Sequence, residues 1–388
     1  MATASTQREA PTDRLEAAEI MRSAGAAGMR MRPVGGATKL GWGRPAAEPD
    51  VEIATGGLAR MIEYNEGDFT AIVEPGMPLA RAQQEFERNG QMLALDPPLG
   101  DGDAATLGGV IATGDSGPLR HRYNAARDLI IGIRVALSDG SLAHAGGKVI
   151  KNVAGYDLAK LYTGSFGTLG LIVEVSLRLH PRPEHTATLV GVTSDPARLA
   201  LAASSLAHAR IELISLDVGW QGGEGRLLAR FGGAAAEALA GEGRGLFEQT
   251  GLDVSLEEHD SELWARQRSG QRSAEGIVAK VSALQGALPR VLAAAERQGG
   301  AVVGRVAAGV SWIKLEGGSP ADGAAAVEEL RRELAPAAVV VLDAPRELRE
   351  AVDPWGAEPD GRLELMRRVK QRFDPSGVCN PGVFVGGI

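Results

Sequence analysis

The run with the most obvious chemical potential is Gly114-Asp115-Ser116-Gly117-Pro118. It resembles the nucleophile loop of trypsin-like proteases, in which a histidine accepts the proton of the serine and a third group orients that histidine. In the trypsin-like order the histidine precedes the serine, but the first histidine of this chain is His121. A single cysteine also excludes the disulfides of that protease class. Ser116 is therefore not a protease nucleophile, which leaves a structural turn or a ligand-binding loop.

Three further glycine-rich loops lie in the first half of the chain, and each carries a hydroxyl side chain. Successive backbone N–H groups in such turns form concavities that bind anions, and glycines let the main chain approach a phosphate or a flat ring. Neither the G-x-G-x-x-G fingerprint after a first strand nor a Walker A pattern is present. Together the loops predict an extended, anionic, ring-bearing ligand outside the Rossmann and P-loop classes. They are Val34–Thr38, Ala105–Gly109 and Thr163–Gly170.

Composition narrows the class of protein further. The chain has 388 residues, which favours two domains, and a net charge of −8, which lacks the basic footprint of a nucleic-acid-binding protein. The lone Cys379 cannot form an internal disulfide or hold an iron–sulfur cluster, which fits a reducing, cytoplasmic compartment. We expect no metal site. The polar N-terminus lacks a signal peptide, and no apolar run is long enough for a transmembrane segment.

Helices and strands alternate in the opening part of the chain, through residue 90. Asp13 is placed to cap a helix over residues 13–25, and Pro78 and Gly90 bracket a second helix. Residues 128–146 read as a hairpin that turns at an Asp-Gly pair. Pro181 and Pro183 mark a boundary near residue 183.

The second half repeats one pattern twice. Strands and helices follow each other over residues 186–251, and again over residues 276–345, in two β-α-β-β-α-β-like rounds. We therefore predict an α+β fold in which one ferredoxin-like antiparallel sheet carries helices on one face. The tail, residues 361–384, reads as an amphipathic helix followed by a loop rich in proline and glycine.

These motifs resemble those of a known family. Residues 32–43, 70–79, 95–140 and 146–183 and the terminal RFDPSGVCNPG are similar to the FAD-binding domain of the vanillyl-alcohol oxidase/p-cresol methylhydroxylase (PCMH) superfamily. VIKNVAGYDLAKL and the DPWG at 353–356 further resemble the E-type FAD-binding subunits of bacterial glycolate oxidase. The resemblance implies a disordered tail over residues 1–12, a two-part PCMH-type FAD-binding domain over 13–183, a cap or substrate domain over 184–350, and a C-terminal helix and loop over 351–388 that return to the FAD domain.

The resemblance also implies a set of cofactor contacts. The first glycine-rich loop would wrap the FAD pyrophosphate, with Ala37 in place of the family's third glycine, a change tolerated if its φ is negative. For Lys151 and Asn152 two interpretations stay open: contact with the flavin, or a position on the surface. No histidine lies in the first loop, and Cys379 reads as a small buried thiol, so we predict non-covalent FAD. The implied cofactor-binding residues are Pro33, Val34, Gly35, Gly36, Ala37, Thr38, Pro98, Thr106, Gly108, Gly109, Thr113, Ser116, Gly117, Gly164, Ser165, Gly167, Gly170, Ile172 and Asn380.

The implied function is oxidation of a 2-hydroxy acid such as glycolate. The resemblance implies a complex with a larger FAD-binding D-type subunit and an iron–sulfur F-type subunit, placed in the cytoplasm or at the inner membrane through its partners. Relatives often carry a metal-binding histidine stretch in the second domain, but residues 304–315 contain none. His121, Tyr123, Lys280 and Arg268 are conceivable catalytic groups, and spacing selects none of them. A catalytically silent FAD-binding or assembly subunit and a stand-alone FAD-dependent alcohol oxidase therefore remain as alternatives.

Overall fold

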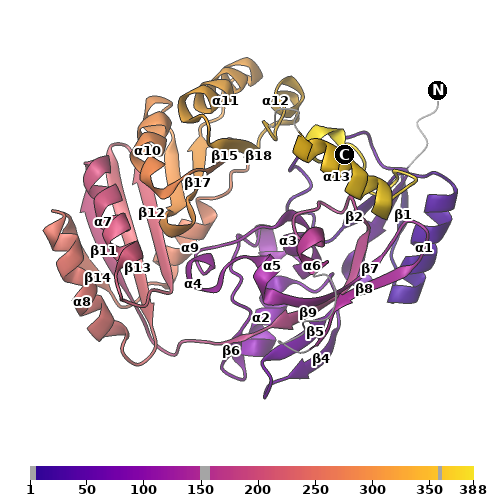
Figure 1. Cartoon of the computed structure of the whole chain (residues 1–388), viewed down its shortest axis with the longest axis horizontal. Helices are drawn as coiled ribbons and strands as arrows, with labels where there is room; N and C mark the ends of the chain where they lie inside the picture. The colour runs from indigo at the N-terminus through magenta and orange to yellow at the C-terminus, as the bar shows by residue number, and fades with distance from the viewer. Residues whose placement is uncertain (1–5, 149–157, 357–360) are drawn as a thin grey trace.

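The computed structural model describes residues 6–148, 158–356 and 361–388. Two bodies lie side by side in Figure 1. The first, in indigo and magenta, holds the N-terminal half of the chain, and the second, in pink and orange, holds the C-terminal half. The yellow C-terminal segment crosses back to the first body. The fold is α+β, as the sequence predicts.

The first domain consists of two unequal parts. A small parallel sheet of order β1-β3-β2 carries the first glycine-rich loop at the end of β2. A larger antiparallel sheet of order β4-β5-β9-β7-β8 supports the remaining loops. The strands are β1 (Gln7–Glu9), β2 (Met31–Val34), β3 (Val51–Ala54), β4 (Met61–Asn65), β5 (Thr70–Val73), β7 (Ile130–Ala136), β8 (Leu142–Gly146) and β9 (Leu171–Arg178), with β6 (Gln91–Met92) pairing with β10 (His180–Pro181).

The two helices that the sequence signals predict in the first domain are present, and the described residues add four short helices that were not predicted. Asp13 accepts hydrogen bonds from the N–H groups of Leu15 and Glu16 and so caps the first helix. Pro78 caps the second, and Gly90, at φ +64°, follows its end. The helices are α1 (Arg14–Ala26), α2 (Leu79–Glu87), α3 (Leu107–Thr113), α4 (Arg120–Tyr123), α5 (Ala126–Leu129) and α6 (Ala159–Tyr162).

The N-terminal residues differ from the expected disordered tail. Gln7–Glu9 form β1, which pairs in parallel with Val51–Ile53 of β3. The Thr6 hydroxyl also donates to the carbonyl of Pro49. Because ladder hydrogen bonds join backbone groups, this polar segment can extend the sheet without burying its side chains.

The second domain confirms the predicted double β-α-β-β-α-β pattern. Its eight antiparallel strands have the order β14-β11-β13-β12-β16-β17-β15-β18, so two ferredoxin-like units join edge to edge at β12 and β16. The strands are β11 (Thr186–Thr193), β12 (Ser215–Gln221), β13 (Glu224–Gly232), β14 (Asp253–Glu257), β15 (Ile277–Ser282), β16 (Ala301–Arg305), β17 (Val310–Leu315) and β18 (Ala338–Asp343).

The two faces of this sheet have different neighbours. Four helices cover one face and enclose the main hydrophobic core with inward residues such as Val218, Ala279 and Ile313. The other face carries Trp264 of a fifth helix at one end and turns toward the first domain at the other. The four covering helices are α7 (Pro196–His208), α8 (Ala236–Gln249), α10 (Leu288–Arg297) and α11 (Pro320–Leu334), and the fifth is α9 (Ser261–Ser269).

The C-terminal segment returns to the first domain, as predicted. After α12 (Arg346–Ala351), α13 (Gly361–Phe373) places the Lys370 ammonium 2.7 Å from the carbonyl of Thr168. The Asn380 amide donates to the carbonyl of Phe166 at 2.7 Å. The final loop therefore closes over the third glycine-rich loop of the first domain.

Candidate functional site

The first glycine-rich loop is held in a conformation that only small residues allow. A Cβ atom on Gly35 would overlap the Thr106 hydroxyl, and one on Gly36 would overlap the carbonyl oxygen of Ala104. Within the described residues, the N–H groups of Gly36, Ala37 and Thr38 have no hydrogen-bond acceptor. Consecutive unpaired N–H groups in a tight turn are suited to an anion such as a pyrophosphate.

A narrow cleft runs from this loop across the first domain. The three glycine-rich loops, β2, the start of β9 and the C-terminal Asn380 all contribute to its wall. A ligand whose phosphates lie at the first loop would therefore continue along this cleft. The sequence-predicted residues that line this cleft are Pro33, Gly35, Gly36, Ala37, Thr38, Thr106, Gly108, Gly109, Thr113, Ser165, Gly167, Gly170, Ile172 and Asn380.

Several residues along the cleft adopt left-handed backbone conformations. Ala37 has φ +58°. We expected its methyl group to be tolerated if φ were negative, and this condition is not met. Phe166, at φ +55°, and Asn380, at φ +39°, lie on the opposite wall. Non-glycine residues in this region cost free energy, and such strain is concentrated at ligand sites.

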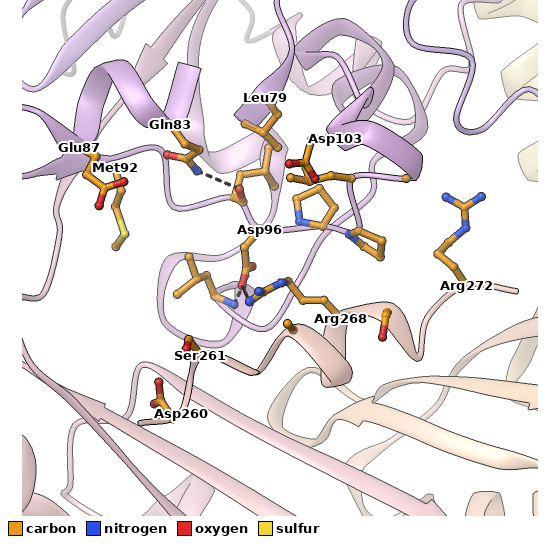
Figure 2. Close-up of a pocket in the computed structure, with 18 of the residues that line it drawn as sticks. Leu79, Gln83, Glu87, Met92, Asp96, Asp103, Asp260, Ser261, Arg268 and Arg272 are labelled. Carbon is orange, nitrogen blue, oxygen red and sulfur yellow. Dashed lines mark hydrogen bonds and ion pairs between the residues drawn. The ribbon is translucent and has the colours of Figure 1, made fainter. Parts of the chain in front are cut away.

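A second, larger cavity of about 1240 Å³ lies between the two domains. Gly36, Ala37 and Thr38 line both cavities, so the first loop stands between them. Pro98, one of the predicted cofactor-binding residues, lines the interdomain cavity and not the cleft. Figure 2 shows α2 above this space and α9 with its following turn below it. A cofactor whose pyrophosphate lies at the first loop can thus reach both spaces.

Asp96 and Arg268 face each other inside the interdomain cavity (Figure 2). The Arg268 guanidinium lies 3.9 Å from one Asp96 carboxylate oxygen, and the N–H of Leu119 donates to the other at 3.0 Å. Burial raises the pKa of Asp96 to about 6 although Arg268 opposes this shift. A carboxyl group with this pKa exchanges protons near neutral pH, which suits a general base. The sequence analysis missed Asp96; the only signal was its position before the Pro97-Pro98 pair.

Ser116 lies at the domain interface with its peptide buried. The Gln271 amide donates to the carbonyl of Ser116 at 3.0 Å, and the amide oxygen of Gln271 accepts from Arg305 at 2.6 Å. The Ser116 hydroxyl lies 3.4 Å from the Arg120 guanidinium, so its partner is a cation and not a histidine base. These contacts agree with the rejection of a protease nucleophile.

Two further ties fix the first loop to the second domain. Arg272 donates to the carbonyl of Thr38 at 2.9 Å and to the Asp343 carboxylate at 2.7 Å. The indole of Trp42 donates to the same carboxylate at 2.7 Å. Hydrogen bonds from the second domain therefore fix the position of the first glycine-rich loop.

Some predicted site residues lie away from both cavities. Val34 is buried at the end of β2, and Gly164 donates its N–H to the carbonyl of Ile111. Gly117 packs against the main chain of Asp96, and Ser116 belongs to the interface described above. Lys151, Asn152 and most of the VIKNVAGYDLAKL motif lie outside the described residues. Cys379 is buried, as predicted, and burial raises the pKa of its thiol to about 12.

Two parts of the sequence match known protein families. Residues 8–146 match the FAD binding domain family, and residues 353–384 match the C-terminal domain of FAD linked oxidases. Residues 8–146 therefore carry an FAD-binding domain, and its cofactor is FAD.

Curated relatives are similar over part of their length. The chain is 33% identical over 192 residues to the GlcE subunit of glycolate oxidase from Escherichia coli (strain K12), covering 47% of this chain and 52% of that protein. It is 34% identical over 209 residues to the mitochondrial D-lactate dehydrogenase [cytochrome] of Arabidopsis thaliana, covering 53% of this chain and 36% of that protein. The chain thus spans about half or less of these relatives. An uncharacterized FAD-linked oxidoreductase of Mycobacterium tuberculosis is 25% identical over 422 residues, covering 96% of this chain and 89% of that protein.

Solved structures support the fold over nearly the whole chain. An alkyldihydroxyacetonephosphate synthase has a TM-score of 0.72 at 14% identity and covers 96% of this chain and 75% of its own. A chitooligosaccharide oxidase has a TM-score of 0.68 at 14% identity and covers 96% of this chain and 90% of its own. At this identity the likeness establishes the arrangement of the two domains alone. Within the described residues, no helix is both long and apolar enough to cross a membrane.

Proposed function

We propose that this chain is an FAD-dependent oxidoreductase that oxidises the CH–OH group of a small 2-hydroxy acid. The observation that carries the proposal is the position of Gly36–Thr38 between the cleft of the first domain and the interdomain cavity. An FAD pyrophosphate at this loop leaves the interdomain cavity for the flavin and a substrate. The names of similar proteins, a glycolate oxidase subunit and a D-lactate dehydrogenase, favour a hydroxy acid as that substrate.

The residues of the cavity supply a proton acceptor. FAD, when bound, supplies the group that accepts a hydride from the carbinol carbon. Asp96 would take the hydroxyl proton on its carboxylate, because its pKa of about 6 leaves it ionised at neutral pH and ready to accept a proton. The Leu119 N–H and the Arg268 guanidinium hold this carboxylate in place.

FAD is proposed to bind without a covalent link. The first loop has no histidine or cysteine, and the Cys379 thiol is buried with a pKa raised to about 12, which leaves it a poor nucleophile. Acid precipitation should therefore release all of the flavin into the supernatant. Flavin that remains with the precipitated protein would contradict this assignment.

The proposed setting is a glycolate-oxidising complex in the cytoplasm, or at the inner membrane through its partners. The similarity to the GlcE subunit supports a larger FAD-binding D-type partner. Because this chain has one cysteine, an iron–sulfur cluster that receives its electrons would belong to a separate F-type subunit.

The visible spectrum of the purified chain tests the proposal directly. Flavin bands should be present and should bleach when glycolate, D-lactate or D-2-hydroxyglutarate is added anaerobically. A Gly36→Glu variant, with bulk and negative charge at the pyrophosphate loop, should be purified without flavin and serves as the control. Bands that bleach only after partner subunits are added would replace the proposal with the catalytically silent subunit. If none of the three hydroxy acids bleaches the flavin bands, either in the purified chain or after partner subunits are added, the proposed function is refuted.

A further inference from the structure

A side chain of the second domain, Arg272, bonds the main chain of the first glycine-rich loop. Arg272 lies just after α9, and in Figure 2 its side chain points toward the first domain. One guanidinium nitrogen donates to the carbonyl of Thr38 at 2.9 Å, and a second donates to the Asp343 carboxylate at 2.7 Å. The N–H of Ser273 donates to the same carboxylate oxygen at 3.0 Å. The guanidinium is therefore fixed in direction by charge-assisted hydrogen bonds before any ligand binds.

Hydrogen bonds within the loop do not set the direction of its N–H groups. The three successive N–H groups of Gly36–Thr38 have no acceptor within the described residues, and neither has the N–H of Lys39. Ala37 is also held at φ +58°, and a non-glycine residue stays in this region only where its surroundings hold it there. The conformation of the loop thus depends on contacts from outside it, and the bond from Arg272 is one of them.

The contact on the Thr38 carbonyl also directs the next N–H group. The peptide between Thr38 and Lys39 is trans, so its carbonyl and its N–H point to opposite sides. Arg272 lines the interdomain cavity, whereas Lys39 lines the cleft of the first domain. With its carbonyl held by Arg272, this peptide turns its N–H away from the second domain.

The end of the same segment is attached to the same carboxylate. The indole of Trp42 donates to the other oxygen of Asp343 at 2.7 Å, and its ring is buried among second-domain residues such as Val278 and Trp312. The Arg272 guanidinium lies 5.1 Å from the centre of the Trp42 ring. The second domain therefore holds residues 38–42 at both ends.

We propose that Arg272 is a positioning residue for the FAD pyrophosphate, which makes tight FAD binding depend on the docked second domain. By holding the Thr38 carbonyl, Arg272 keeps the neighbouring N–H groups in the direction that the phosphates require, so less conformational freedom is lost on binding. This role requires FAD with its pyrophosphate at the first loop, a placement that Gly36→Glu tests separately, and it is independent of the substrate.

The test compares three ligands on the full chain after its flavin has been removed. FAD carries both flavin and pyrophosphate, ADP carries the pyrophosphate without the flavin, and riboflavin carries the flavin without phosphate. Flavin fluorescence measures the dissociation constants of FAD and riboflavin, and calorimetry measures that of ADP. Arg272→Gln should weaken FAD and ADP at least about tenfold and change riboflavin binding by less than about twofold.

Two control variants separate this role from general effects. Gln271→Ala removes a neighbouring contact between the domains, with Ser116 and Arg305, and does not touch the loop. It should lower the melting temperature but leave the ratio of the FAD and riboflavin dissociation constants unchanged. Arg266→Gln removes a positive charge at an exposed position of α9 and should leave the binding of all three ligands unchanged.

Arg272→Lys separates direction from charge. Lysine keeps the charge, but its ammonium does not reproduce the planar fork between the Thr38 carbonyl and Asp343, so ADP affinity should fall nearly as far as in Arg272→Gln. If Arg272→Gln does not fold, this variant carries the comparison. Full ADP affinity in Arg272→Lys would overturn the positioning role, because the charge alone would then suffice. An equal loss of FAD and riboflavin affinity would also overturn it and would mark Arg272 as a contact that only joins the domains.

Discussion

Gly36 faces the main-chain carbonyl of Ala104 so closely that a Cβ atom on Gly36 would overlap the carbonyl oxygen. The two residues belong to loops far apart in the sequence, one after β2 and one before α3. Their contact brings together the loop with unpaired N–H groups and the loop with the Thr106 hydroxyl. The wall of the cleft therefore depends on the absence of a side chain at Gly36.

Gly36→Ala should disrupt this wall. The methyl group cannot fit without moving one loop away from the other, so the purified variant should lose most of its FAD and several kcal/mol of stability. Flavin content measured as the ratio of visible to ultraviolet absorbance, together with thermal unfolding, checks this. Gly41→Ala is the control, because no atom lies near its Cβ position and its φ is ordinary. Full FAD retention in Gly36→Ala would show that the loop contact is dispensable.

Ala37→Gly should stabilise the protein. Glycine adopts the φ of +58° without the steric cost that an alanine bears, and this relief of roughly 1–2 kcal/mol exceeds the added entropy of the unfolded chain. We expect a net gain of about 0.5–1 kcal/mol in chemical denaturation with FAD affinity retained. Ala47→Gly, at an exposed residue with ordinary φ, should destabilise instead. A loss of stability in Ala37→Gly would mean that the methyl group makes contacts worth more than the strain.

Gln271→Ala should weaken the junction between the domains. The substitution leaves the carbonyl of Ser116 and the guanidinium of Arg305 without a shared partner in a buried setting, at a cost of roughly 2–4 kcal/mol. Denaturant unfolding measures the loss. Gln249→Ala, at an exposed glutamine near the end of α8, provides the comparison. Equal stabilities of the two variants would argue that water replaces the Gln271 amide.

Asp96→Asn should separate catalysis from stability. The folded pKa of about 6 exceeds the ordinary value of 3.8, so the folded protein binds a proton more tightly than the unfolded chain. Stability of the unmodified protein should therefore fall as pH rises from about 4 through about 6, and the loss should persist at higher pH. The asparagine does not titrate and keeps the acceptor for the Leu119 N–H, so at pH 8 it should be more stable by roughly 1–3 kcal/mol.

The same Asp96→Asn substitution should lower kcat by about a hundredfold or more and remove the acidic limb of the pH profile near pH 6. Asp101→Asn is the matched variant, since Asp101 lines the same cavity but is exposed. An unchanged pH profile in Asp96→Asn would assign the proton to another group. Unfolding curves at pH 5 and pH 8 measure the stability effect independently of turnover.

Local signals explain how much of the fold could be predicted from sequence. Asp13, Pro78 and Ser319 start helices because their side chains or fixed φ satisfy the first helical turn, and these effects act within a few residues. The tail at residues 7–9 could not be predicted, because its strand depends on the free edge of β3 and not on its own polarity.

Part of the candidate site could be predicted from local sequence. Glycine and hydroxyl residues identify the loops that line the cleft of the first domain, since only small residues permit such close backbone contact. Asp96 carries no such local pattern. Its raised pKa comes from burial and from neighbours such as Arg268, which the second domain supplies.

The sequence by itself therefore determined the α+β class, the repeated unit of the second domain and the glycine-rich loops, because periodicity, capping and steric size are properties of short segments. Only the tertiary structure decided which buried charges meet. Asp115 pairs with Lys39 and Asp217 with Arg305, and all four side chains are buried. Those pairs, like the raised pKa of Asp96, join residues that are far apart in the sequence, because charge pairing and desolvation depend on distance in space.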